Sequence, residues 1–314
     1  MSVEESKALY RHFVEEVINN GKFDEIPGLY TEDYVDHSAP PGAPAGVDGV
    51  RGVFTMFRTA FPDVHFVIDD MVGENDLVAT RVTGQGTQDG QFMAFPPSGR
   101  HAVWGSKGIF RVRDGKISEH WGMPDLVALL GQIGALPPEA VMPHADTSDL
   151  HPRPDVEVAD AHEPARIARN KAVASRISRA FTTGDQASCV EFIASDYVDH
   201  PPAKFFNVPF TGPESLQGAV RVFKEGFPDL VETVEEMIAE DNKVVIRSLW
   251  KGTHTGEFVG IPATGKPVVL TGINFYRVGE DGMLVERHGS FDVLGMMQQL
   301  GLVPSPGAAP AGAH

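Results

Sequence analysis

Apolar residues follow a helical period at the start of each half of this chain and an alternating period afterwards. In the first half, helical spacing over 9–18 stops at Asn20-Gly21, and a later helical stretch ends at Pro62. The pattern then alternates, as it does in strands joined by Glu-Asn-Asp and Arg-Asp-Gly turns. The predicted strands are 64–69, 77–83, 102–112 and 116–121, and a last helix follows over 126–133.

Helices followed by an antiparallel meander predict an α+β fold, in which the N-terminal helices cover one face of a curved antiparallel sheet. Such a curved sheet can leave a small-molecule pocket between its concave face and the helices. The second half repeats the order, with helices that contain 167–181 and 216–227 and a last helix over 293–300. We therefore expect two domains of one fold class.

Short motifs show that the two halves are copies of one sequence. Asp-Tyr-Val-Asp-His at 33–37 recurs at 196–200, and Phe-Pro-Asp at 61–63 recurs at 227–229. Matched residues continue in the same order to the end of each half, which indicates a tandem duplication. Further pairs are Arg81 with Arg247, Gly86-Thr87 with Gly252-Thr253, Phe92 with Phe258, Glu119 with Glu286, and Asp125 with Asp292.

The stretch between the copies is rich in proline and acidic residues and has no apolar period, which is typical of a linker. The predicted organisation is domain 1 over 1–135, a linker over 136–164, domain 2 over 165–303 and a disordered tail over 304–314. The lone histidines of the linker and the tail are assigned no role.

Composition narrows the class of partner. The chain has 314 residues, of which 42% are hydrophobic and 22% charged, so each half can bury a core without disulfides. A net charge of -17 argues against nucleic acid or an anionic membrane as a partner. The acidic N-terminus lacks the features of a secretory signal, and no apolar run is long enough to span a membrane, so we expect a cytoplasmic protein. The single cysteine, Cys189, is interpreted as core filler.

Several motifs resemble those of one known family. These are Asp-Tyr-Val-Asp-His-x-x-Pro, Phe-Pro-Asp, the segment 252–266, and Glu-x-Trp or Glu-x-His followed by Asp and a helix that ends in Gln-x-Gly. In this order they resemble the SnoaL-like polyketide cyclases, or ester cyclases, of the nuclear transport factor 2-like superfamily. The resemblance covers nearly all of both copies and implies the cone-shaped fold. It constrains function less, because the same fold hosts cyclases, isomerases, dehydratases, epoxide hydrolases and binding modules.

The resemblance implies a general acid/base at Asp292 and Asp125, which follow the last strand of each copy. A carboxylate in an apolar, partly dry pocket has its charged form disfavoured, so it can take a proton from an acidic carbon. Both aspartates also directly precede a predicted helix, where aspartate is a common N-cap. The two interpretations are compatible and both stay open.

Histidines supply further catalytic candidates. His37 and His200 end the repeated Tyr-Val-Asp-His motif, where they can bind a substrate carbonyl, orient the acid/base or simply cap a loop. His254 and His288 occur in the second copy only, and either can equally be a surface residue of a strand. Because of these two, we expect the second copy to be the better equipped for proton transfer.

Other residues are candidates for substrate binding. Arg81 and Arg247 lie on predicted central strands, where an arginine must be paired or face a solvated cavity, and a structural ion pair is the competing interpretation. Aromatic and amide side chains at positions where the copies differ would make the first pocket more aromatic and the second more polar. The remaining candidates are Trp104, Trp121, Asn274, Tyr197 and Tyr34.

Three functions fit the sequence. The first is a cofactor-independent enzyme that removes a carbon-bound proton from a small hydrophobic carbonyl compound, leading to cyclisation or isomerisation. The second is epoxide opening by paired carboxylates, Asp36 with Asp63 or Asp199 with Asp229. The third is a non-catalytic binding module whose two copies form an intrachain pseudo-dimer. We expect neither metal nor cofactor, because compact metal motifs and phosphate-binding loops are absent from the sequence.

Overall fold

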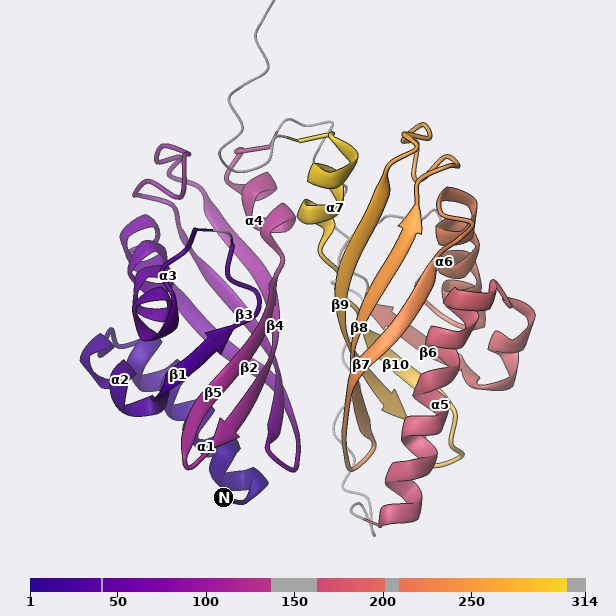
Figure 1. Ribbon diagram of the computed structural model, residues 1–314, viewed down its shortest axis with the longest axis horizontal. Coiled ribbons are helices and arrows are strands. Elements are labelled where there is room, and N and C mark those ends of the chain that lie inside the picture. The colour runs from indigo at the N-terminus through magenta and orange to yellow at the C-terminus, as the bar shows by residue number, and fades with distance from the viewer. Residues whose placement is uncertain (41, 137–162, 201–208, 304–314) are drawn as a thin grey trace, which may run out of the picture. The chain divides into compact units, whose positions relative to one another are not determined.

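The structure is a computed structural model that describes residues 1–40, 42–136, 163–200 and 209–303. The described residues divide into two compact units: unit 1 contains those up to 136 together with Ile238–Glu240, and unit 2 contains the others from 163 onward. Each unit contains helices and one five-stranded sheet (Figure 1). Most of the predicted linker and the whole predicted tail lie outside the described residues. Within those residues, no helix is long and apolar enough to cross a membrane.

The first helix of unit 1 is set by its local sequence. Helix α1 (Val3–His12) starts at a capping box, in which Ser2 and Glu5 each accept a hydrogen bond from the other's backbone N–H. The helix continues directly as a π-helix over Phe13–Ile18, so the predicted helix is present but its winding changes half-way. The other helices of this unit are η2 (Phe23–Glu25), α2 (Ile26–Leu29), α3 (Gly46–Ala60) and α4 (Leu126–Gln132).

Unit 2 repeats this order with a longer first helix. Helix α5 (Pro164–Thr183) carries proline at its first position, where the missing N–H would have no partner in the helix. It ends at Gly184, whose φ of 76° is readily adopted only by glycine. Because the helix begins at Pro164, this residue belongs to unit 2 and not to the predicted linker over 136–164. The other helices are η3 (Ala187–Glu191), α6 (Pro213–Gly226) and α7 (Val293–Leu300).

The two sheets have the same strand order. The order is β1-β5-β4-β3-β2 in unit 1 and β6-β10-β9-β8-β7 in unit 2. The strands of unit 1 are β1 (Tyr30–Asp36), β2 (His65–Glu74), β3 (Leu77–Thr87), β4 (His101–Arg113) and β5 (Lys116–Pro124). Those of unit 2 are β6 (Ile193–His200), β7 (Val231–Glu240), β8 (Lys243–Thr253), β9 (Pro267–Val278) and β10 (Leu284–His288).

The predicted α+β class is confirmed, but the sheets are mixed and not purely antiparallel. The antiparallel meander accounts for four strands of unit 1, and the repeated Tyr-Val-Asp-His motif supplies a fifth, β1, which pairs with β5 in parallel. In unit 2, β6 pairs with β10 in the same way. The polar residues of the motif hide the alternation that marks a strand. This parallel pairing brings Asp36 opposite His120, and Asp199 opposite Arg287.

Helices cover one face of each sheet (Figure 1). Large buried side chains form the core of each unit. In unit 1, Gly84 pairs with Trp104, and a Cβ at Gly84 would lie only 2.7 Å from the indole. In unit 2, Trp250 occupies the place of Gly84 and pairs with Leu270. The indole thus comes from the opposite strand of the pair in the two copies, which keeps the volume of the core nearly unchanged. Trp104, a predicted pocket residue, is buried among Phe57, Phe61 and Phe66.

Candidate functional site

A histidine and an aspartate lie together on the helix-covered face of unit 1. His120 Nδ1 is 3.3 Å from Asp36 Oδ1, and both side chains are about a quarter exposed, at 22% and 28%. The same oxygen accepts hydrogen bonds from the amide and the hydroxyl of Ser38, at 2.9 and 2.5 Å. Burial acts to raise the pKa of Asp36, but His120 and Ser38 outweigh it and lower the pKa to about 2. Asp36 is therefore a carboxylate that holds the Nδ1 side of the imidazole.

The other ring nitrogen of His120 faces the interior of unit 1. The ring stacks on Phe110, with centroids 4.5 Å apart, and a Cβ at Gly108 would lie 3.2 Å from Nε2. Phe110 in turn contacts Tyr10 of helix α1, which places this group on the helix-covered face. The Tyr10 phenol lies beside the Thr80 hydroxyl, and burial raises the pKa of Tyr10 to about 12. The site thus combines a held imidazole with neutral hydroxyl donors, the groups needed to move a proton and stabilise an oxyanion.

Unit 2 has an arginine where unit 1 has this histidine. Arg287 is buried, and its guanidinium donates to Asp199 Oδ2 at 3.2 Å and to Asn274 Oδ1 at 3.2 Å. Ser215 of helix α6 also donates to Asp199, at 3.0 Å, so this network faces the helices. Burial opposes the charged form of Arg287, but Asp199 above all outweighs it and raises the pKa of the guanidinium. Asn274, a predicted pocket residue, stands at the position that Gly108 has in unit 1, and it is buried against Arg287.

The interior of unit 2 holds a second buried acid that the sequence analysis missed. Glu232 on β7 takes the inward position that Phe66 has on β2, and burial raises its pKa. Its Oε2 has no hydrogen-bond partner among the described residues. Tyr197 is also buried in this interior, and burial raises the pKa of its hydroxyl. In unit 1 the corresponding Tyr34 is buried against the ring of Tyr30, and burial raises its pKa too. The interiors of the two copies therefore differ, because unit 2 has a buried arginine and a second buried acid where unit 1 has His120 and Phe66.

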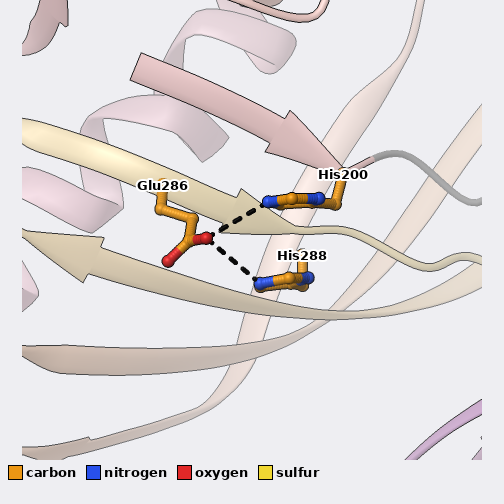
Figure 2. A group of neighbouring side chains, drawn as sticks. All are labelled: His200, Glu286 and His288. Carbon is orange, nitrogen blue, oxygen red and sulfur yellow. Dashed lines mark hydrogen bonds and ion pairs between the residues drawn. The ribbon is translucent and has the colours of Figure 1, made fainter. Parts of the chain in front are cut away.

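The predicted motif histidines lie on the opposite face of each sheet. His288 and Arg287 are neighbours on β10, and successive strand residues point to opposite faces. His200 Nε2 is 3.1 Å and His288 Nε2 3.5 Å from Glu286 Oε1, and the two rings stack with centroids 4.1 Å apart (Figure 2). We call these three residues the histidine–glutamate cluster. It is separated by the sheet from the Arg287 network.

Unit 1 carries a related group at the same place. His37 Nε2 is 2.8 Å from Glu119 Oε2, and its ring stacks on Trp121, with centroids 4.6 Å apart. Arg111 pairs with Glu119 and lies over the Trp121 ring. His37, His200, His288 and Trp121 are therefore not brought to the helix-covered face. The strand turns the His288 side chain away from the helix-covered interior of unit 2, so its predicted part in proton transfer has no support from the groups of that interior.

The two copies each match the same family of known proteins. The model of the SnoaL-like polyketide cyclase family matches residues 8–133 and 171–300. The chain belongs to this family. The two matches cover both units, so the tandem duplication and the SnoaL-like fold inferred from the motifs are confirmed.

Individual relatives match one copy's length. The aklanonic acid methyl ester cyclases DauD of Streptomyces sp. (strain C5) and DnrD of Streptomyces peucetius are each 33% identical over 128 residues, which is 40% of this chain and 78% and 86% of theirs. Among solved structures, TsrD from Streptomyces laurentii is 29% identical, covers 43% of this chain and 99% of its own, and has a TM-score of 0.41. IdmH from Streptomyces antibioticus, a putative polyketide cyclase, is 34% identical, with 41% and 97% covered and a TM-score of 0.37.

Asp125 and Asp292 are N-caps, as one of the two interpretations predicted. Asp125 accepts a hydrogen bond from the Ala128 amide at 2.9 Å, and Asp292 accepts one from the Gly295 amide at 2.8 Å. Asp125 is half-buried, whereas Asp292 is exposed. The apolar, water-poor surroundings expected for the acid/base are therefore not found at Asp292, because the cap holds its carboxylate at the surface.

The two strand arginines form the predicted ion pairs. Arg81 lies 3.5 Å from Asp69, and Arg247 pairs with Glu235. The paired carboxylates proposed for epoxide opening are also engaged elsewhere. Asp63 accepts hydrogen bonds from the amide and hydroxyl of Thr87, and its counterpart Asp229 does the same with Thr253.

His254 holds a loop of unit 2. It is fully buried beside Phe227 and Phe258, and its Nδ1 accepts a hydrogen bond from the Thr264 amide at 3.3 Å. In unit 1, Gln88 serves the corresponding loop by donating to the Gly90 and Pro96 carbonyls. The partners of His254 are thus those of a structural residue, distinct from the histidine–glutamate cluster.

The buried position of His254 predicts a pH dependence of stability. Burial lowers the pKa of His254, so the unfolded chain binds a proton more readily than the folded one. Stability should therefore fall as the pH drops below the unfolded value of about 6.5. In the variant His254→Gln, which places the unit 1 residue there, this loss should be smaller between pH 7 and pH 5. Melting temperatures measured across this range test it, and equal slopes for both proteins would contradict it.

Proposed function

We propose that the chain catalyses intramolecular ring closure of a polyketide-type ester, and that His120 of unit 1 is the general base. The observation that carries this proposal is the imidazole held at Nδ1 by Asp36, with Nε2 on the side of Gly108, where a Cβ would lie 3.2 Å from it. Family membership supports a cyclase acting on a small molecule. The relatives' names point to the methyl ester of a polyketide acid as the substrate class.

The chemistry needs only a proton shuttle and oxyanion stabilisation. His120 Nε2 removes a proton from a carbon beside a carbonyl, and the electron pair of that C–H bond forms an enolate. The enolate carbon attacks a second carbonyl of the same molecule, which forms the new C–C bond and an alkoxide. The alkoxide takes the proton back from His120. The Tyr10 and Thr80 hydroxyls stabilise the oxyanion, since Tyr10 stays protonated at neutral pH. Substrate and product are isomers, so no other reactant is consumed.

Asp125 is the competing candidate for the base. The family resemblance implies an acid/base aspartate at this point of the chain, and Asp125 is half-buried. Its hydrogen bond to the Ala128 amide stabilises the helix end, and a base that is also a cap would serve both purposes. In unit 2 we propose no proton transfer, because Arg287 replaces His120 and stays charged.

The test is conversion of aklanonic acid methyl ester by the purified full chain. We expect a product of unchanged mass and changed retention time in liquid chromatography with mass detection, formed without added cofactor. The same protein should not accelerate the hydrolysis of simple epoxides, which would add the mass of water. Ring closure at the rate of the buffer control for this ester and for related polyketide methyl esters would contradict the proposal.

A further inference from the structure

The histidine–glutamate cluster has no role in the proton transfer proposed for unit 1. It lies on the face of the unit 2 sheet that the helices do not cover, at the ends of β6 and β10 (Figure 2). Two imidazoles and one carboxylate form a donor set that suits Zn²⁺ and neighbouring transition ions, in contrast to the oxygen ligands preferred by Mg²⁺ and Ca²⁺. We propose that His200, Glu286 and His288 bind one divalent transition-metal ion of the Zn²⁺ type.

The distances between the donor atoms fit such an ion. Ligand atoms that lie 2.0–2.1 Å from a tetrahedral ion are about 3.3 Å from one another. The two nitrogen-to-oxygen distances to Glu286 Oε1 are 3.1 and 3.5 Å, on either side of that value. All three donor atoms lie within 4.8 Å of one another. The donor atoms are therefore close enough for one ion, provided that the stacked rings tilt so that both nitrogen lone pairs point to it, and a fourth position is left for water.

The surroundings of Glu286 orient it for this purpose. Its side chain is only 2% exposed, and Arg277 Nε lies 3.0 Å from Oε2. The guanidinium thus fixes one carboxylate oxygen and directs the other, Oε1, at the two imidazoles. Residues that hydrogen-bond to a metal ligand in this way fix its orientation and usually increase the affinity for the metal. The histidine side chains are also largely buried, at 10% and 15% exposed, so few rotamers compete with the converging arrangement.

Unit 1 provides the natural contrast. It keeps the histidine, the glutamate and the arginine as His37, Glu119 and Arg111, but Trp121 stands where unit 2 has His288. An indole offers no lone pair to a metal ion. Of these four matched positions, the one that differs between the copies is the one that completes a three-ligand set in unit 2.

Calorimetric titration of the chelator-treated full chain with ZnCl₂ tests the proposal. We expect one equivalent to bind tightly to the wild type. His288→Trp, which restores the unit 1 arrangement, should weaken this binding by at least about 100-fold. Loss of a residue that only hydrogen-bonds to a metal ligand already lowers metal affinity about 10–100-fold. His200→Gln should do the same and guards against a folding defect in the first variant. Circular dichroism checks both.

His37→Gln is the matched control, since it removes the corresponding histidine of unit 1 and should leave the affinity unchanged. Absence of stoichiometric Zn²⁺ binding by the wild type would overturn the proposal. So would equal binding by the wild type and both unit 2 variants, which would assign the ion to other histidines of the chain. Neither result depends on the ring-closure assay, so the metal site and the proposed function stand or fall separately.

Discussion

Replacement of His120 by alanine should lower kcat for ring closure by about 10²–10⁴-fold, the usual contribution of a positioned general base. The substitution removes the imidazole but leaves Asp36 with its two hydrogen bonds from Ser38, so β1 and β5 should stay paired. The ring is partly exposed, and its removal leaves no fully enclosed cavity. Steady-state rates with the polyketide ester, together with circular dichroism of the variant, measure the effect.

His37→Ala is the matched control for this loss. His37 is the next motif residue after Asp36 and lies on the other face of the sheet, against Glu119 and Trp121. Its removal should change kcat by less than the loss of the base does, because it has no access to the helix-covered interior. Asp125→Asn separates the two candidate bases. If His120→Ala retains activity and Asp125→Asn loses it, the general base is Asp125 and not His120.

Much of the fold was predictable because its signals are local or repeated. Apolar periodicity, together with proline, glycine and turn residues a few positions away, predicts most elements. These are the helix that ends before Pro62, the strands joined by turns and the last helix of each copy. The strand β1, which contains Asp33–Asp36 of the motif, was not predicted as a strand, because its partner β5 lies far along the chain and four of its seven residues are polar. Parallel pairing with a distant strand leaves no local pattern to read.

The site was less predictable, since it depends on which face each strand residue occupies. Asp36 and His37 are neighbours, yet only Asp36 reaches the interior, where it meets His120. His120 lies between Glu119 and Trp121 on β5, and no sequence signal marks it as the residue of this strand that faces the interior. Glu232 was missed for a related reason, because β7 turns this acid inward and leaves Val231 exposed. A shift of one residue in strand parity exchanges the two faces, and sequence alone does not fix that parity.

Replacement of Asp199 by asparagine should lower the free energy of unfolding of unit 2 by about 3–5 kcal/mol, because it leaves the Arg287 charge buried without its main partner. Both side chains are almost fully enclosed, at 4% and 9% exposed, so water cannot replace the lost carboxylate. Asparagine keeps the shape of the side chain and an oxygen for the Ser215 hydroxyl, so the change is chiefly one of charge. Native-state hydrogen exchange of β6 and β10 amides in the full chain reports this loss for unit 2 specifically.

The corresponding substitution in unit 1 gives the matched control. Asp36→Asn removes a carboxylate from a pair whose side chains are 28% and 22% exposed, and exchange of β1 and β5 amides should show a loss of only about 0–1 kcal/mol. In unit 2, the double change Asp199→Asn with Arg287→Met should recover part of the loss, since it removes the unpaired charge as well. Equal losses for the two single variants, or no recovery in the double variant, would mean that Arg287 does not depend on Asp199 and that the ionic interior of unit 2 is not what stabilises it.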